Sequence, residues 1–423
     1  MNNAADLIAR APTDWKGAVM QRRLRRRYRA ERCFRLLGLA AVVGSAAFLA
    51  VLLVAVLGNG LGGFVRTRIA LPLDLPRQGI AIDPVRLRGP GADLALAAAN
   101  IEGATDAAAV AAFGRGGDDL LSDSAWLTVR DAIKADPTLL VRRATIAVPA
   151  ADAIDSAAKG RGEAAARARL AALEARGAIS RGVNWAFLTG ADSTDSTSAG
   201  IWGALKGSIF TMLVTLALAF PVGLLAALYL EEYAPRNRWT DLIEVSINNL
   251  AAVPSITFGL LGLAIFLGTM HLPRSAPLVG GLTLALMTMP VIVIAGRGAI
   301  KGVPPSIRDA ALGIGASPVQ VVFHHILPLA LPGILTGTII GMARALGETA
   351  PLLMIGMRAF VAAPPKGFTD PSSVLPVQIF LWSDQIDRGF VEKTSAAIIV
   401  LLLFLFAMNG IAIYLRNRFE TRW

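Results

Sequence analysis

Six blocks of apolar residues, each about twenty residues long or slightly longer, set the first limit on how this chain can fold. They cover residues 36–57, 206–230, 248–267, 276–296, 330–356 and 395–415. A helix needs about 20 apolar residues to cross the roughly 30 Å hydrocarbon core of a bilayer. Only 17% of the residues are charged and 54% are hydrophobic, which is unlike a soluble domain. The sequence therefore predicts an all-α polytopic membrane protein with six transmembrane helices.

The basic residues are concentrated next to these blocks. Residues 1–57 carry ten basic and three acidic side chains, whereas residues 58–200 carry sixteen of each. Basic residues flank spans on the cytoplasmic side, so residues 1–35 and the tail 416–423 are both expected in the cytoplasm. The segment 21–35 could instead bind nucleic acid, but topology and anionic lipid headgroups already account for its charge. We therefore expect lipid and no nucleic acid as its partner.

Residues 58–200 separate the first helix (36–57) from the other five (within 201–415), and the alternation of spans puts them outside the cytoplasm. Their composition predicts a small, mainly α domain, with helices within 124–137 and 157–177 and a short strand over 144–150. The segment contains neither histidine nor cysteine. No nucleophile–base pair or metal-ligand spacing is visible in it, so its function cannot be read from its residues.

The polar segment between spans four and five is unusually ordered for a loop. Pro304 and Pro305 suit the first turn of a helix, and Gly313 and Gly315 suit its end. Ser317 is then a good N-cap, with Pro318 after it and Gln320 completing a capping box. The segment is predicted to be a rigid helix–turn–helix on the cytoplasmic face.

The residues of this segment also resemble a known signature. DAALGIG (Asp309–Gly315), followed by Leu327–Pro328, resembles the EAA motif of binding-protein-dependent ABC importer permeases. Asp309 stands where that family has glutamate, and His325 stands where it has isoleucine, so local packing is expected to differ there. The resemblance implies a coupling helix that docks into a separate ATPase subunit, formed by Asp309, Ala310, Ala311, Gly315, Ser317, Leu327 and Pro328.

Two further stretches are similar to the phosphate importers within that family, the type with an extended N-terminal domain. They are ARALGETAPLL (Ala343–Leu353) and VLPVQIFLW (Val374–Trp382). This resemblance implies a permease subunit in a bacterial inner membrane. Its partners would be a second permease subunit, a dimer of ATPase subunits and a periplasmic phosphate-binding protein. The chain itself is expected to be no enzyme and to bind no cofactor and no metal. No Gly-Lys dipeptide of a Walker A loop occurs in it, so ATP is expected to be bound by the partner ATPase subunit.

Arg344 and Glu348 are charged residues inside the fifth apolar block. They are four residues apart and so share a helix face. Charges within a membrane are costly unless they are paired or face water, which makes them candidates for a translocation path. Arg344 could attract a passing oxyanion, and Glu348 could hold Arg344 or accept a proton from hydrogen phosphate. A purely structural ion pair is the alternative.

Other functions stay open at this point. The chain could be a permease for another oxyanion, such as molybdate or sulfate. A secondary transporter is a second alternative, although no convincing internal repeat is visible. A membrane enzyme is disfavoured, because three histidines and one cysteine give little catalytic constellation. His324 and His325 are expected to be packed or interfacial side chains rather than metal ligands.

Overall fold

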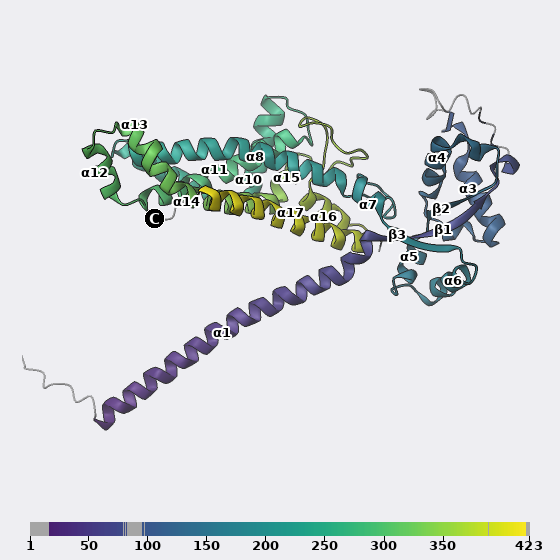
Figure 1. The fold of residues 1–423 in the computed structure, drawn as a ribbon, viewed down its shortest axis with the longest axis horizontal. Helices are drawn as coiled ribbons and strands as arrows, with labels where there is room; N and C mark the ends of the chain where they lie inside the picture. Colours follow the sequence, from purple (N-terminus) through teal and green to yellow (C-terminus); the bar gives the residue numbers. More distant parts are fainter. Residues whose placement is uncertain are drawn as a thin grey trace, which may run out of the picture. The chain divides into compact units, whose positions relative to one another are not determined.

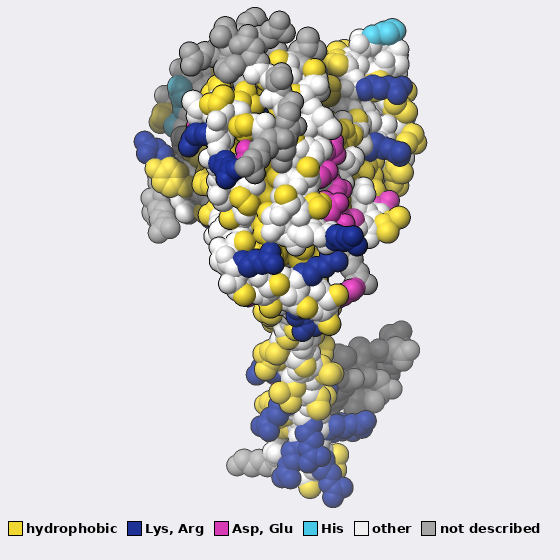
Figure 2. Space-filling view, turned by 90° about the vertical axis from the view of Figure 1, so that its right-hand side faces the viewer, with side chains coloured by type: hydrophobic (Ala, Val, Ile, Leu, Met, Phe, Trp, Pro, Cys, Tyr) yellow, Lys and Arg dark blue, Asp and Glu magenta, His cyan; other side chains and the backbone are white. Residues whose placement is uncertain are grey.

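The computed structural model describes residues 17–78, 80, 82, 95–96, 98–387 and 389–419. The chain divides into two compact units, Met1–Leu57 and Gly58–Trp423. The first unit is carried by one helix, α1 (Ala18–Gly60), and Lys and Arg side chains gather at one end of this helix (Figure 2). Its 43 residues extend about 65 Å at 1.5 Å per residue, roughly twice the thickness of the hydrocarbon core. The basic part of α1 therefore has to lie outside the hydrocarbon.

The second unit begins with a domain that is built on a small antiparallel sheet (Figure 1). Its strands are β1 (Val65–Leu73), β2 (Ala144–Pro149) and β3 (Ile179–Val183), in the order β2-β1-β3. Ile69 of β1 pairs with Val148 of β2 on one side and with Ile179 of β3 on the other. We call residues 65–183 the sheet domain. The predicted strand at 144–150 is confirmed as β2, whereas β1 and β3 were not predicted.

Helices cover this sheet and supply most of the domain core. They are α3 (Ile101–Phe113), α4 (Ala125–Ala135), α5 (Asp152–Ala158) and α6 (Ala164–Ala175). Ile69 of β1, Val129 and Ile133 of α4 and Val148 of β2 are fully buried in one apolar cluster. The helix predicted within 124–137 is confirmed as α4. The helix predicted over 157–177 is divided, because α5 ends at Ala158 and α6 begins at Ala164.

The two ends of the sheet domain lie next to each other. The backbone N–H of Asn184 donates to the carbonyl oxygen of Phe64 at 2.9 Å, and the Asn184 side chain donates to Gly63 at 3.0 Å. The short helix α7 (Trp185–Thr189) follows, and its Phe187 is buried with Trp382 and Phe390 from the C-terminal part of the chain. The chain thus leaves and re-enters the helical bundle at nearly the same point.

The helical bundle is built around α11 (Pro277–Lys301), which packs against α8 (Trp202–Leu228) and α14 (Leu327–Gly347). Small residues allow close packing: a Cβ on Gly281 of α11 would collide with Val214 of α8, and one on Gly337 of α14 with Ala295 of α11. Such glycines let helix backbones approach closely in membranes. The bundle is completed by α15 (Ala350–Met354), α16 (Leu375–Ser383) and α17 (Gly389–Phe419).

The third predicted span, Asn248–Leu267, is not one straight helix. The structure has α9 (Arg238–Ala251) and α10 (Ser255–Gly262), the latter continuing as a π-helical turn, Leu263–Thr269. The two halves meet at 100°. Pro254 lies at the break and has no N–H for a continuous helix. Among the described residues, five helices are long and apolar enough to cross a membrane, or six if this bent pair counts as one span.

Candidate functional site: the helix–turn–helix segment and the charged residues of the bundle

The segment between α11 and α14 has the predicted helix–turn–helix form. Its first helix is α12 (Pro305–Gly313), and the second begins with α13 (Pro318–Gln320) and continues as a π-helical turn, Val321–Ile326. Gly315 has a φ of +91°, a conformation that glycine adopts at little cost. The Gln320 N–H donates to Ser317 Oγ, and the Ser317 N–H donates to Gln320 Oε1 at 2.9 Å. The predicted capping box is confirmed, and it fixes the direction of the second helix.

The predicted coupling residues divide into a buried and an exposed group. Ala311 is buried against Val321 and Val322, which holds the two helices together, and Leu327 and Pro328 are half-buried at the start of α14. The exposed group is Asp309, Ala310, Gly315 and Ser317. Exposed apolar side chains accompany it at the tip: Leu312, Ile314 and Val319. An exposed apolar tip on a rigid support is typical of a docking surface.

Arg308 attaches α12 to the rest of the bundle. Its Nη2 lies 2.5 Å from Glu232 Oε1, in the π-helical turn Tyr229–Tyr233 that ends α8. The same guanidinium donates to the backbone oxygens of Val303 and Ile300 at 3.1 and 3.3 Å. The hydrogen bond to Glu232 raises the pKa of Arg308 above its ordinary value. A charged side chain with these partners gives the segment a stiff connection to α8.

Beside the Arg308–Glu232 ion pair, a second group of charged side chains links α8, α9 and α11. Arg297 of α11 donates to Glu231 after α8 at 3.3 Å and to Glu244 of α9 at 2.9 Å. Lys301 lies 3.7 Å from the same Glu231 oxygen. The side chains of Arg297 and Glu231 are only 14% and 15% exposed, so this network is better shielded from water than a surface ion pair. A displacement of the segment therefore has a path to α8, α9 and α11 together.

Sequence reasoning did not find this network. Arg297, Glu231, Glu232 and Glu244 come from three separate helices, and their spacing along the chain shows no motif. The only available signal was the Glu231–Glu232 pair directly after an apolar span, followed by basic residues at the ends of later helices. His324 and His325 are exposed and half-buried respectively, and the described residues contain no group of three or more His, Cys, Asp or Glu that could hold a metal ion.

The structure brings Arg344 and Glu348 together at the end of α14. Arg344 Nε lies 3.6 Å from Glu348 Oε1, and the two side chains are 52% and 20% exposed. The fifth apolar block, 330–356, was expected to form one continuous helix. Instead, α14 ends at Gly347 and α15 begins at Ala350, and the pair lies beside this break. The buried Pro351 in the first turn of α15 accounts for this break, because its missing N–H cannot continue the ladder.

Arg344 lies on the outward face of α14. Ile340, one turn earlier, is 62% exposed on the same face, as the i, i+4 spacing requires. A guanidinium on an outward face of a membrane helix cannot face lipid without a large free-energy cost. Arg344 lies only three residues before the end of α14 at Gly347, so polar surroundings are expected on that side.

The bundle of long apolar helices with its rigid helix–turn–helix segment has the architecture of a polytopic membrane protein. Residues 219–421 match the family of binding-protein-dependent transport system inner membrane components, and residues 21–168 match a domain of unknown function, DUF3333. The chain belongs to the binding-protein-dependent transport permease family.

Curated relatives agree with this assignment. The chain is 32% identical over 202 residues to the probable ABC transporter permease protein YqgI of Bacillus subtilis, covering 47% of this chain and 67% of that protein. It is 33% identical over 178 residues to the phosphate transport system permease protein PstA 1 of Mycobacterium tuberculosis, covering 42% of this chain and 58% of that one. Among solved structures, the inward-facing MetNI methionine ABC transporter covers 52% of this chain and 95% of its own, with 16% identity and a TM-score of 0.41.

Proposed function

We propose that this chain is the permease subunit of an ATP-driven phosphate importer of the PstA type. The observation that carries the proposal is the exposed, rigid tip around Gly315, because a membrane channel or an anchor has no need of such a docking surface. The names of the curated relatives support phosphate as the cargo. Arg344 supports an anionic cargo, because it offers a fixed positive charge at the end of α14.

The proposal includes partners and an orientation. A second permease subunit would cover the outward face of α14 and complete the path beside Arg344. A dimer of ATPase subunits would bind ATP and receive the tip at Gly315, and a phosphate-binding protein would deliver the anion from outside. The tip and both chain ends would face the cytoplasm, in line with the basic residues at both ends.

The direct test uses the complete transporter in sealed vesicles. We would purify the tagged chain gently, identify the subunits that accompany it, and reconstitute the complex with ATP and the binding protein. ATP-dependent uptake of labelled phosphate is expected, with unlabelled phosphate competing and sulfate and molybdate not competing. Competition by sulfate or molybdate would indicate a permease for another oxyanion, and uptake that follows an ion gradient without ATP would contradict the proposal.

Removal of the sheet domain is expected to leave ATP-driven uptake measurable. The Phe64 carbonyl and the Asn184 N–H are 2.9 Å apart, so a short Gly-Ser linker can replace residues 65–183 without moving α7 or α8. Vesicles with the shortened chain are compared with vesicles containing wild type at equal amounts of assembled complex. A control deletion of 65–195 also removes Phe187, which is buried with Trp382, and should fail to assemble. Complete loss of uptake by the correctly assembled 65–183 deletion would show that the domain is part of the transport mechanism.

A further inference from the structure

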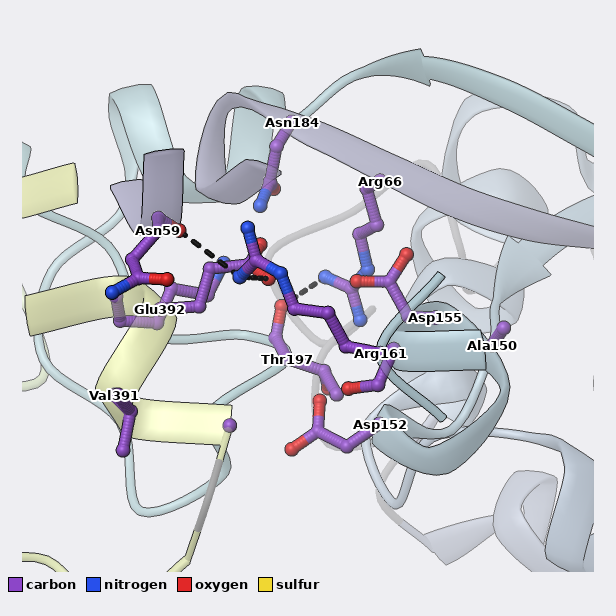
Figure 3. A pocket seen from close by; sticks show the side chains of 13 residues that line it. Asn59, Arg66, Ala150, Asp152, Asp155, Arg161, Asn184, Thr197, Val391 and Glu392 are labelled. Carbon is purple, nitrogen blue, oxygen red and sulfur yellow. Dashed lines mark hydrogen bonds and ion pairs between the residues drawn. The ribbon is translucent and has the colours of Figure 1, made fainter. Parts of the chain in front are cut away.

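A cavity of about 370 Å³ lies where the sheet domain meets the start of α17. Figure 3 shows its lining, to which strand β1, helix α5, the turn after α5 and the first turns of α17 contribute. The lining also includes Asn59, Ala150, Asn184 and Thr197. The charged side chains of this lining are Arg66, Asp152, Asp155, Arg161, Glu392 and Lys393. None of them takes part in the coupling segment or in the Arg344–Glu348 pair.

Two carboxylates of the lining already have cationic partners. Lys159 Nζ lies 2.6 Å from Asp155 Oδ2 and 2.5 Å from Glu392 Oε1, and so bridges the sheet domain to α17. Arg161 Nη1 lies 3.4 Å from Glu392 Oε2 and also donates to the carbonyl oxygen of Asn59 at 3.2 Å. Asp155 and Glu392 are therefore neutralised within the protein.

Two cations of the lining have no such partner. Arg66 is 6% exposed and Lys393 is 7% exposed, and within the described part of the chain no carboxylate lies within 4.0 Å of either. Arg66 Nη1 donates to the Thr197 carbonyl oxygen, whereas its Nη2 has no hydrogen-bond partner among the described residues. The Lys393 ammonium lies 5.1 Å from the centre of the Phe187 ring. Two buried cations without an ion-pair partner within 4.0 Å are unfavourable, and an anion in the cavity would add to the partial compensation from the nearby carboxylates.

The start of α17 adds to this preference for an anion. Gly389, Val391, Glu392 and Lys393 all line the cavity, so the first turn of a 31-residue helix lies at its wall. The Gly389 N–H donates to Asp387 Oδ1 at 3.0 Å and the Phe390 N–H donates to the Asp387 carbonyl oxygen at 3.1 Å. The dipole of the helix still favours negative charge at such a position. Burial lowers the pKa of Arg66 to about 10, an effect that the nearby Asp195, Asp155 and Asp152 only partly offset, and the guanidinium remains charged at neutral pH.

Asp152 gives the cavity a means of selecting between anions. Its Oδ2 accepts a hydrogen bond from the Ser196 hydroxyl, and no donor to its Oδ1 is found among the described residues. Burial raises the pKa of Asp152 to about 6, so at neutral pH the group is mostly a carboxylate. A carboxylate can accept a hydrogen bond from an anion that keeps a hydroxyl proton, but it repels an anion without one, such as sulfate.

We propose that this cavity binds a phosphate group that keeps a hydroxyl proton, with Arg66 and Lys393 holding its oxygen atoms and Asp152 accepting a hydrogen bond from its hydroxyl. Inorganic phosphate and the headgroup of phosphatidic acid both have this chemistry. The site lies outside the proposed path at Arg344 and does not depend on the proposed function. When occupied, it joins the sheet domain to α17 through Arg66 on one side and Lys393 on the other.

The test measures binding to the purified full-length chain in detergent by calorimetry. The probes are inorganic phosphate, a short-chain phosphatidic acid, sulfate and a short-chain phosphatidylcholine. Wild type is expected to bind phosphate, phosphatidic acid or both, and the stronger of the two identifies the source. It is expected to bind sulfate and phosphatidylcholine at least about tenfold more weakly, which is about 1.4 kcal/mol. No saturable binding of either phosphate probe, or equal binding of sulfate, would overturn the inference.

Variants identify where the probe binds. Arg66→Gln and Lys393→Gln are each expected to weaken binding more than about tenfold, while Arg68→Gln, on the same strand but outside the cavity lining, is expected to have no effect. Asp152→Asn is expected to admit sulfate, because an amide donates where the carboxylate repels. Thermal unfolding of each variant confirms folding, and two cavity variants are used so that one unfolded variant does not decide the result.

Binding that survives Arg66→Gln and Lys393→Gln but is lost in Arg344→Ala would place the anion in the membrane path and reject the cavity. Phosphate uptake by a complex whose cavity binds nothing would reject this inference and leave the proposed function intact.

Discussion

Phosphate uptake by the assembled complex is expected to fall by more than about tenfold when Gly315 is replaced by arginine, while the chain still inserts in the membrane. Gly315 lies at the exposed tip with a φ of +91°, and no atom outside its own turn lies within 4 Å of the point that a Cβ would occupy. The arginine would add strain of about 1–3 kcal/mol in a left-handed backbone and would occupy the space of a docked partner. Uptake in vesicles and the amount of ATPase that co-purifies are the two measurements.

A matched substitution separates strain from docking. Gly315→Asn puts a small side chain at the same position, and asparagine tolerates the left-handed conformation better than other non-glycine residues. It is expected to keep most of the uptake and to bind the ATPase. Arg308→Lys, at the base of the segment, serves as a second comparison, because it keeps the charge beside Glu232 but loses the hydrogen bonds to the backbone. Full uptake by Gly315→Arg would contradict the docking role of the tip.

The second large effect is expected at Arg344. Arg344→Ala should abolish phosphate uptake, because it removes the fixed positive charge and leaves Glu348 without a partner. Arg344→Lys should retain partial uptake, since it keeps the charge but loses the planar fork of donors. Arg344 Nε lies 3.6 Å from Glu348 Oε1, and the Arg344 side chain is 52% exposed in this chain, so folding of the chain is expected to depend little on the pair. The amount of assembled complex is measured for each variant, so that a loss of uptake can be assigned to transport.

The double variant decides between a substrate role and a structural role. Arg344→Ala with Glu348→Gln removes both charges, so a merely structural pair would be replaced by a neutral one and uptake would recover. If Arg344 contacts phosphate, the double variant should assemble and stay inactive. Arg358→Ala, an exposed arginine in the loop after α15, is the control and is expected to transport normally. Recovery in the double variant would rule out a substrate role for Arg344.

Local features of this chain were predictable because they rest on neighbouring residues. The capping box of Ser317 and Gln320, the turn at Gly315 and the helix α4 depend on residues within one or two turns of each other, and all three are confirmed. The apolar blocks were predictable for the same reason, since hydrophobicity over about twenty residues suffices to recognise a span. The resemblance of Asp309–Gly315 to the EAA motif added a predicted role for the segment, which the spacing of its residues alone does not indicate.

Features that depend on distant residues were not predictable. Strand β1 begins only a few residues after a long helix, and it is recognisable as a strand only through its partners at 144–149 and 179–183. The 100° bend next to Pro254 was not predicted, because a hydropathy profile contains no information on the direction of the helix axis. The Arg308–Glu232 connection and the cavity at Arg66 join positions more than seventy residues apart. Only folding brings such charges together, and hydropathy and local spacing give no sign of it.

The close approach of Phe64 and Asn184 explains how a permease can contain an inserted domain of this size. Because the chain returns to its point of departure, the sheet domain adds no net displacement between Phe64 and α7, and none of its described residues belongs to a candidate membrane span. An insertion of this geometry does not change the number of spans that precede each later loop. Every following loop therefore lies on the same side of the membrane with or without the insertion. A chain that lacks residues 65–183 is therefore expected to keep the topology of every helix that follows.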